Sequence, residues 1–207
     1  HPDGEQTIEV FHFDGETITH ERTLQDPSLI MPNDLVLTAP GRFYVTNDHG
    51  YPDGFMRLIE DYGGLALCNV LYYNGNTFKE VAKDISYANG VNYDKERKLL
   101  YVASSRGFLI RVFKENTPGQ LEFLDDIDCH TGVDNIELDE NGHLLIGAHP
   151  NLLRFTSYAK GKAATTPSEF LEIIYREKEE TIITPIYMEN GFQVIERHLL
   201  LKRYLVG

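Results

Sequence analysis

Asparagine and aspartate residues open three similar segments of the chain, and their oxygens could together hold a divalent cation. The polar residues are Asn33 or Asn47 in the first segment, Asn89 in the second, and Asp134 with Asn135 in the third. Calcium takes about six to eight oxygen ligands in flexible geometry, whereas magnesium requires a tighter shell with more water. A bound calcium could polarise an ester carbonyl and stabilise the oxyanion formed by water attack. Asparagine also opens turns through its own side chain, so spacing alone leaves both interpretations open.

These residues belong to an internal repeat that predicts how they are positioned. Residues 33–46, 89–103 and 134–148 each read as a polar start, a strand, a polar turn and a second strand, and their starts lie 89 − 33 = 56 and 134 − 89 = 45 residues apart. This interval is close to the repeat of roughly 40–50 residues in β-propellers. The innermost strand of each blade begins at one end of the central channel, so the polar starts should converge there. The alternative is a chance similarity of ordinary hairpins.

Strand signals dominate the rest of the chain, and we expect an all-β fold. Alternating or β-rich runs occupy residues 7–13, 16–20, 66–73, 98–103, 108–113 and 143–148, with turn signals at Asp14-Gly15 and Asn74-Gly75. Short helical turns are expected only within residues 52–62 and 166–175. We interpret residues 1–207 as one propeller domain. At 45–50 residues a blade it supplies roughly four blades, and we favour a larger ring whose preceding segment is missing.

The composition excludes several classes of protein. The formal net charge is −13, so the basic face of a nucleic-acid binder is not expected. No apolar run approaches the length of a transmembrane helix. A Gly-X-Ser-X-Gly elbow, a nucleophilic cysteine signature and a phosphate-binding glycine loop are also missing. The two cysteines, Cys68 and Cys129, are interpreted as buried thiols.

Several short stretches resemble the paraoxonase/arylesterase family. They are residues 43–49, 64–66 with 70–73, 87–92, 133–136 and 147–151, which follow the family's order at similar spacing within a resemblance that runs from residue 1 to about residue 190. The resemblance implies a calcium-dependent six-bladed β-propeller that hydrolyses lactones and aryl esters, with a side activity on organophosphate triesters. It also favours secretion or association with a lipid or membrane surface, and it indicates no oligomeric state.

The resemblance implies a role for each matching residue. It makes Asn47, Asn89, Asp134 and Asn135 ligands of a catalytic calcium, and Asp48 a ligand of a second, structural calcium. The motif that starts at His1 resembles the strand end that carries one histidine of the catalytic pair, so His1 is the assisting histidine beside another that activates water.

Other candidates carry a functional and a structural interpretation. Tyr87 is expected in the substrate pocket or in the core, and His149 at the substrate or in a structural hydrogen bond. His49 and His130 flank metal-ligand positions, where we expect exposed loop residues rather than groups that orient a ligand.

The chain departs from the family in two places. A calcium-ligating Glu, a neighbouring structural Asp and the other active-site histidine have no counterpart here, and residues 192–207 look compressed. We therefore expect that these residues are pieces of a larger protein. Two other readings stay open: a gluconolactonase- or regucalcin-like sugar lactonase, and a non-catalytic calcium-stabilised propeller of the strictosidine-synthase or interaction type.

Overall fold

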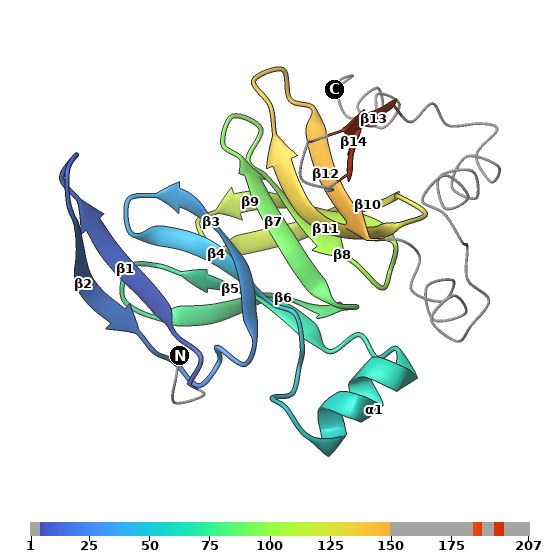
Figure 1. Cartoon of the computed structure of the whole chain (residues 1–207), viewed down its shortest axis with the longest axis horizontal. Coiled ribbons are helices and arrows are strands. Elements are labelled where there is room, and N and C mark those ends of the chain that lie inside the picture. Colours follow the sequence, from blue (N-terminus) through green and yellow to red (C-terminus); the bar gives the residue numbers. More distant parts are fainter. Residues whose placement is uncertain (1–4, 150–183, 188–192, 197–207) are drawn as a thin grey trace.

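The computed structural model describes residues 5–149, 184–187 and 193–196, which form antiparallel sheets and one helix (Figure 1). A two-stranded sheet pairs β1 (Ile8–Phe13) with β2 (Ile18–Leu24). The first four-stranded sheet has the order β3-β4-β5-β6, with bounds Pro32–Ala39, Arg42–Asn47, Cys68–Tyr73 and Phe78–Ile85. Helix α1 (Phe55–Gly63) lies in the connection between β4 and β5 and ends at Gly64, which adopts a left-handed conformation.

Two further four-stranded sheets follow in chain order. The second has the order β7-β8-β9-β10, with bounds Ala88–Asp94, Leu99–Ser104, Leu109–Thr117 and Gln120–Asp128. The third has the order β11-β12-β14-β13, with bounds Gly132–Leu138, Leu144–His149, Gln193–Glu196 and Thr184–Tyr187. The predicted all-β fold is confirmed, and so are the predicted hairpins at Asp14-Gly15 and Asn74-Gly75.

The first strand of each four-stranded sheet lies innermost. β7 contacts β3 on one side and β11 on the other, so the three inner strands stand next to one another (Figure 1). Successive four-stranded sheets whose first strands lie side by side form the arrangement of β-propeller blades. The first two sheets are meanders, whereas in the third β14 lies between β12 and β13. As the repeat predicts, the starts of β7 and β11 carry Asn89 and the Asp134-Asn135 pair.

Apolar side chains that alternate along each strand fill the spaces between the sheets. In β4, Tyr44 packs with Val91 and Leu100 of the second sheet, while its neighbours Phe43 and Val45 pack towards β1 and β2. Successive side chains of a strand point to opposite faces, so one strand serves two cores. A third core joins the second and third sheets.

A buried carboxylate also ties the first sheet to the second. Glu115 of β9 accepts a hydrogen bond from the hydroxyl of Tyr44 at 2.5 Å and another from the hydroxyl of Tyr93 at 2.5 Å. Burial and the nearby carboxylate raise the pKa of both tyrosines. The two hydroxyls therefore remain donors, and this contact joins β4, β7 and β9.

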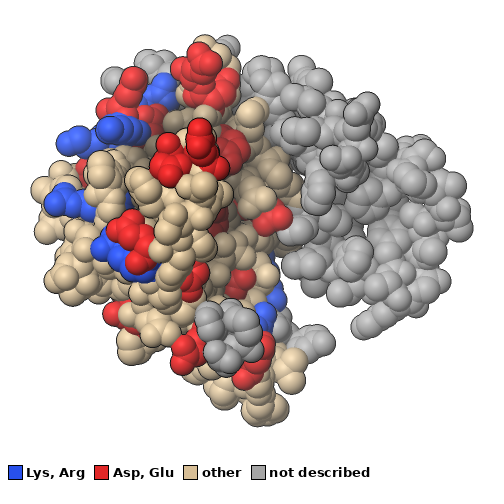
Figure 2. All heavy atoms as spheres, turned by 60° about the vertical axis from the view of Figure 1, so that its left-hand side comes forward, with Lys and Arg blue, Asp and Glu red and all other residues tan. Residues whose placement is uncertain are grey.

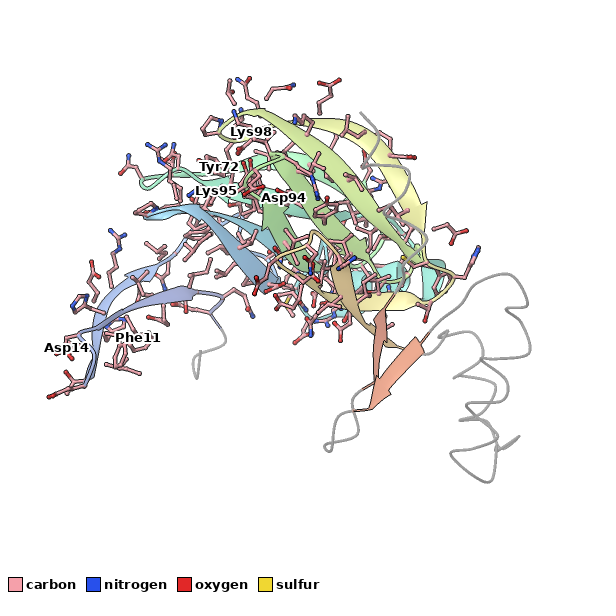
Figure 3. All side chains as sticks on the ribbon, turned by 90° about the horizontal axis from the view of Figure 1, so that it is seen from above. Phe11, Asp14, Tyr72, Asp94, Lys95 and Lys98 are labelled. Carbon is pink, nitrogen blue, oxygen red and sulfur yellow. The ribbon has the colours of Figure 1, made fainter. Side chains whose placement is uncertain are left out.

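The periphery differs from the sheet interfaces. Figure 3 places Phe11 and Asp14 on the β1–β2 hairpin, away from the turn after β7 that carries Asp94, Lys95 and Lys98. On the face seen in Figure 2, the described residues show acidic and basic side chains interspersed, without one continuous basic area. None of the helical structure in the described residues has the length and apolar character that a bilayer span requires.

Two further sequence predictions are confirmed, and two others lie wholly or mostly outside the described residues. The helix expected within residues 52–62 is present as α1, and Cys68 and Cys129 are buried as predicted. The helix expected within residues 166–175 lies outside the described residues, as does most of the compressed segment 192–207.

Candidate metal centre

The starts of β7 and β11 bring three predicted ligands to one place. A Cβ added at Gly90 would overlap the carbonyl oxygen of Asp134 and lie 2.8 Å from the Cα of Asn135. The backbones of the two strands can approach this closely because Gly90 has no side chain. The residue that follows Asn89 therefore lies against the backbone of Asp134 and Asn135, and the starts of two sheets meet at this place.

The amide of Asn89 is buried, yet its oxygen is open. Only 4% of the residue is exposed, and its Nδ2 donates to the Oγ of Ser105 at 3.2 Å. Among the described residues no donor reaches Asn89 Oδ1, and the amide of Asn135, which is exposed, makes no hydrogen bond. An amide oxygen without a donor is available to accept a hydrogen bond from water or to bind an ion.

This set of donors fits calcium. Two amide oxygens and the carboxylate of Asp134 are hard oxygen ligands, which calcium prefers. Within the part of the chain that the structure describes, no three His, Cys, Asp or Glu side chains gather as a metal site. A metal centre here would therefore depend on amide oxygens as much as on charge.

The first sheet reaches the same place through its backbone and a threonine. The hydroxyl of Thr46 donates to the carbonyl oxygen of Asn89 at 2.7 Å, and the carboxylate of Asp34 accepts the backbone N–H of Val91 at 2.8 Å. The end of β4 thus lies against the start of β7, which brings Asn47 within one residue of the contact.

The amide of Asn47 uses all of its hydrogen-bonding positions. Its Oδ1 accepts the backbone N–H groups of Ile30 and Met31 at 3.1 and 3.0 Å. Its Nδ2 donates to the carbonyl oxygen of Ser28 and to Oδ1 of Asn69, each at 2.8 Å. An amide has two acceptor and two donor positions, and all four are used. Asn47 therefore fastens the segment before β3, and its role as a calcium ligand stays a prediction.

Asp48 and His49, which follow Asn47 in the chain, form a buried pair. One Asp48 carboxylate oxygen lies 2.6 Å from Nδ1 of His49, and the other accepts a hydrogen bond from Asn33 Nδ2 at 2.9 Å. His49 is only 2% exposed, so the expectation that it is an exposed loop residue is wrong. The His49 ring packs edge-on against Tyr87 with 5.0 Å between centroids. His130 is exposed, as predicted.

A buried glutamate holds the loop that follows this pair. Glu60 of α1 accepts the backbone N–H of Gly50 at 2.9 and 3.1 Å, and it is 1% exposed. The thiol of Cys68 donates to the carbonyl oxygen of Asp48 at 2.8 Å, and burial raises the pKa of Cys68 to about 12. This part of the structure is thus a buried support held by hydrogen bonds.

Tyr87 sits half-buried at the entry to β7 in an unusual backbone conformation. Its φ is 60°, which a bulky residue seldom adopts. Its carbonyl oxygen accepts the backbone N–H of Ser105 at 3.1 Å, and Arg106 lies over its ring at 5.0 Å. Strained residues that neighbours hold in place cluster at functional sites, and this position fits a pocket wall.

The two predicted histidines are described less fully. The backbone of His149 pairs with Gly132 across β11 and β12, which puts the end of β12 beside the start of β11, while its side chain lies outside the described residues. His1 also lies outside them. Sequence reasoning missed Thr46, Glu60 and Ser105, because the partners of these residues are distant in the chain and form no local motif.

Comparisons with known proteins point to one family. The arylesterase family model matches residues 1–203. Human serum paraoxonase/arylesterase 1 is 36% identical over 194 residues, which is 92% of this chain and 54% of that protein. Bovine serum paraoxonase/arylesterase 2 is 34% identical over the same length and shares. The chain thus spans about half the length of these relatives.

Solved structures give a weaker likeness. A luciferin-regenerating enzyme has a TM-score of 0.48 and 14% identity, covering 70% of this chain and 49% of that one. A protein described as a gluconolactonase has a TM-score of 0.45 and 16% identity, covering 66% and 44%.

Proposed function

Because the chain belongs to the arylesterase family, we propose that it is a calcium-dependent hydrolase of lactones and aryl esters. Organophosphate triesters are a proposed side activity of the same site. The proposal rests on one observation above all: the amide oxygen of the buried residue Asn89 has no donor among the described residues, and the next residue, Gly90, lies against the backbone of Asp134 and Asn135. Family membership supplies the class of reaction, and these oxygens supply a place for the metal.

In this proposal Asn89, Asp134 and Asn135 hold the catalytic calcium, with Asn47 as a further ligand. The bound ion supplies Lewis-acid chemistry that polarises an ester carbonyl. Two neutral amides and one carboxylate neutralise little of the ion's charge, which leaves it strongly attractive to the carbonyl oxygen of a substrate. Asp48 would hold a second, structural calcium, after releasing one of its present hydrogen bonds.

The remaining roles follow from position. Tyr87 provides an apolar wall two residues before Asn89, and pockets for small molecules combine such walls with few polar groups. His149 at the end of β12 is the second proposed substrate contact, and His1 is the proposed assisting histidine. We further propose that the whole chain is one domain, roughly four blades of a six-bladed ring, and that it binds small lipophilic esters rather than nucleic acid.

The test combines metal removal with substitution. We expect EDTA to abolish hydrolysis of a lipophilic lactone, calcium to restore it, and both Asn89→Ala and Asp134→Ala to remove calcium binding together with turnover. Hydrolysis at the untreated rate after EDTA contradicts the proposal. Preference for sugar lactones would support the gluconolactonase-like reading, and calcium binding without turnover across an ester panel would support a non-catalytic propeller.

A further inference from the structure

A serine hydroxyl lies between the two sheets that carry the predicted ligands. Ser105 follows β8 directly and is 3% exposed. Its Oγ donates to the carbonyl oxygen of Val133, the residue immediately before Asp134, and accepts from Nδ2 of Asn89 at 3.2 Å. A single side chain therefore touches the start of β7 and the start of β11.

The directions of these two hydrogen bonds determine which end of the Asn89 amide faces outward. A serine hydroxyl has one proton, and the carbonyl of Val133 can only accept, so that proton is committed to Val133. Towards Asn89 the hydroxyl presents lone pairs alone, and only the NH2 end of the amide can bond to them. The Oδ1 end must then turn away from Ser105. The hydroxyl of Ser105 thus determines by itself which end of the amide points outward.

The other contacts of Asn89 hold its backbone and leave its side chain to Ser105. The hydroxyl of Thr46 bonds to the carbonyl oxygen of Asn89, not to its amide. Among the described residues, the hydrogen bond to Ser105 is the one polar contact of the Asn89 side chain. The two ends of an amide have nearly the same size, so without Ser105 rotation of the group would cost little in packing.

We propose that Ser105 is a positioning residue that keeps the carbonyl oxygen of Asn89 turned towards the bound calcium. This inference rests on the proposed function, since it needs a metal at this centre. Ser105 does not itself touch the metal. Its bond to Val133 also fixes the distance between Asn89 and the strand that carries Asp134 and Asn135, so one hydroxyl sets the relative placement of ligands from two blades.

The experiment measures metal binding directly in the full chain. Calcium affinity is determined by titration, and europium is bound in place of calcium so that luminescence lifetimes in H2O and D2O count the waters on the ion. Ser105→Ala should weaken calcium binding about tenfold, in line with losses at residues that orient metal ligands. It should also add about one water to europium, because water replaces the misdirected oxygen. Ser105→Thr, which keeps the hydroxyl, should restore both values.

Ser104 provides a matched control. It is equally buried at 3%, and its Oγ donates to the carbonyl oxygen of Ser86 at 2.9 Å without contact to a predicted ligand. Ser104→Ala removes the same kind of buried hydrogen bond, so calcium affinity and europium hydration should stay unchanged.

The outcomes separate this inference from the proposed function. If the unaltered chain binds neither calcium nor europium, the proposed function is wrong and the role of Ser105 goes with it. If it binds both and Ser105→Ala binds equally well with the same hydration, only the inference about Ser105 is wrong. Equal losses in Ser104→Ala and Ser105→Ala would also overturn it, by showing a general packing effect. Should Ser105→Ala fail to fold, Ser105→Cys replaces it, with a partial loss of affinity expected from its weaker acceptor.

Discussion

Asn47 and Asn89 are the same residue type near the same contact between β4 and β7, yet their amides are used in opposite ways. Asn47 makes four hydrogen bonds and fastens residues 28–31 and Asn69. Asn89 makes one, to Ser105, and leaves its oxygen open. A saturated amide stabilises the fold, whereas an amide oxygen without a donor stays available to a ligand. Near the same contact, one amide thus supports the fold, and the other is the one that we propose binds the metal.

The largest effect should come from the saturated amide. Asn47→Ala leaves two backbone N–H groups and two acceptors without their partner, and we expect a loss of about 3 kcal/mol in the free energy of unfolding without calcium. Denaturant titration measures it. Asn47→Asp, which keeps the two accepted bonds, should lose about half as much. A variant Asn47→Ala that is stable but no longer binds calcium would erase the distinction between the two asparagines.

The second largest effect should be on the stability that calcium binding adds, and it should depend on Asn89 and not on Asn47. At a free calcium concentration of 100 times Kd, a ligand that binds the folded state alone adds about 2.7 kcal/mol. We expect calcium to raise the free energy of unfolding of the unaltered chain by this amount and EDTA to remove the gain. In Asn89→Ala, calcium should add little, and the stability without calcium should be close to that of the unaltered chain. Thermal unfolding with and without calcium shows the difference. An equal gain in both proteins would remove Asn89 from the metal centre.

Separating β7 from β11 should affect stability and binding together. Gly90→Ala places a Cβ against the backbone of Asp134 and Asn135, which cannot move aside as a flexible side chain could. We expect a loss of about 2 kcal/mol and weaker calcium binding. Gly63→Ala is the control, because its Cβ would meet only ordinary contact with Leu65. If Gly90→Ala binds calcium like the unaltered chain, the close approach of the two strands is not needed for the centre.

The smallest effect should come from the hydroxyl that joins the two regions. Thr46→Val keeps the shape of the side chain but removes the hydrogen bond to the carbonyl oxygen of Asn89. We expect a loss of about 1 kcal/mol in unfolding free energy. Calcium affinity should change less than in Ser105→Ala, because Thr46 holds the backbone and not the amide. A larger loss of affinity in Thr46→Val than in Ser105→Ala would reverse the roles assigned to these two hydroxyls.

The sequence predicted the elements and the approach of the strand starts better than it predicted the state of each side chain. Alternation along β1 and the repeat at Asn89 and Asp134 are local patterns, and they predicted hairpins and adjacent inner strands correctly. The saturation of Asn47 depends on how residues 28–31 fold back over it, and the burial of His49 depends on Tyr87, which precedes β7. Such contacts between distant residues leave no periodic signal in the chain.

The first and second sheets are tied at three points along β7, through Thr46 at Asn89, through Asp34 at Val91 and through the Tyr44–Glu115–Tyr93 contact. Separate hydrogen bonds along one strand oppose rotation of one sheet against the other, since rotation about any one of them would stretch the others. The seam between these two sheets should therefore stay shut, so a ligand would not enter between them.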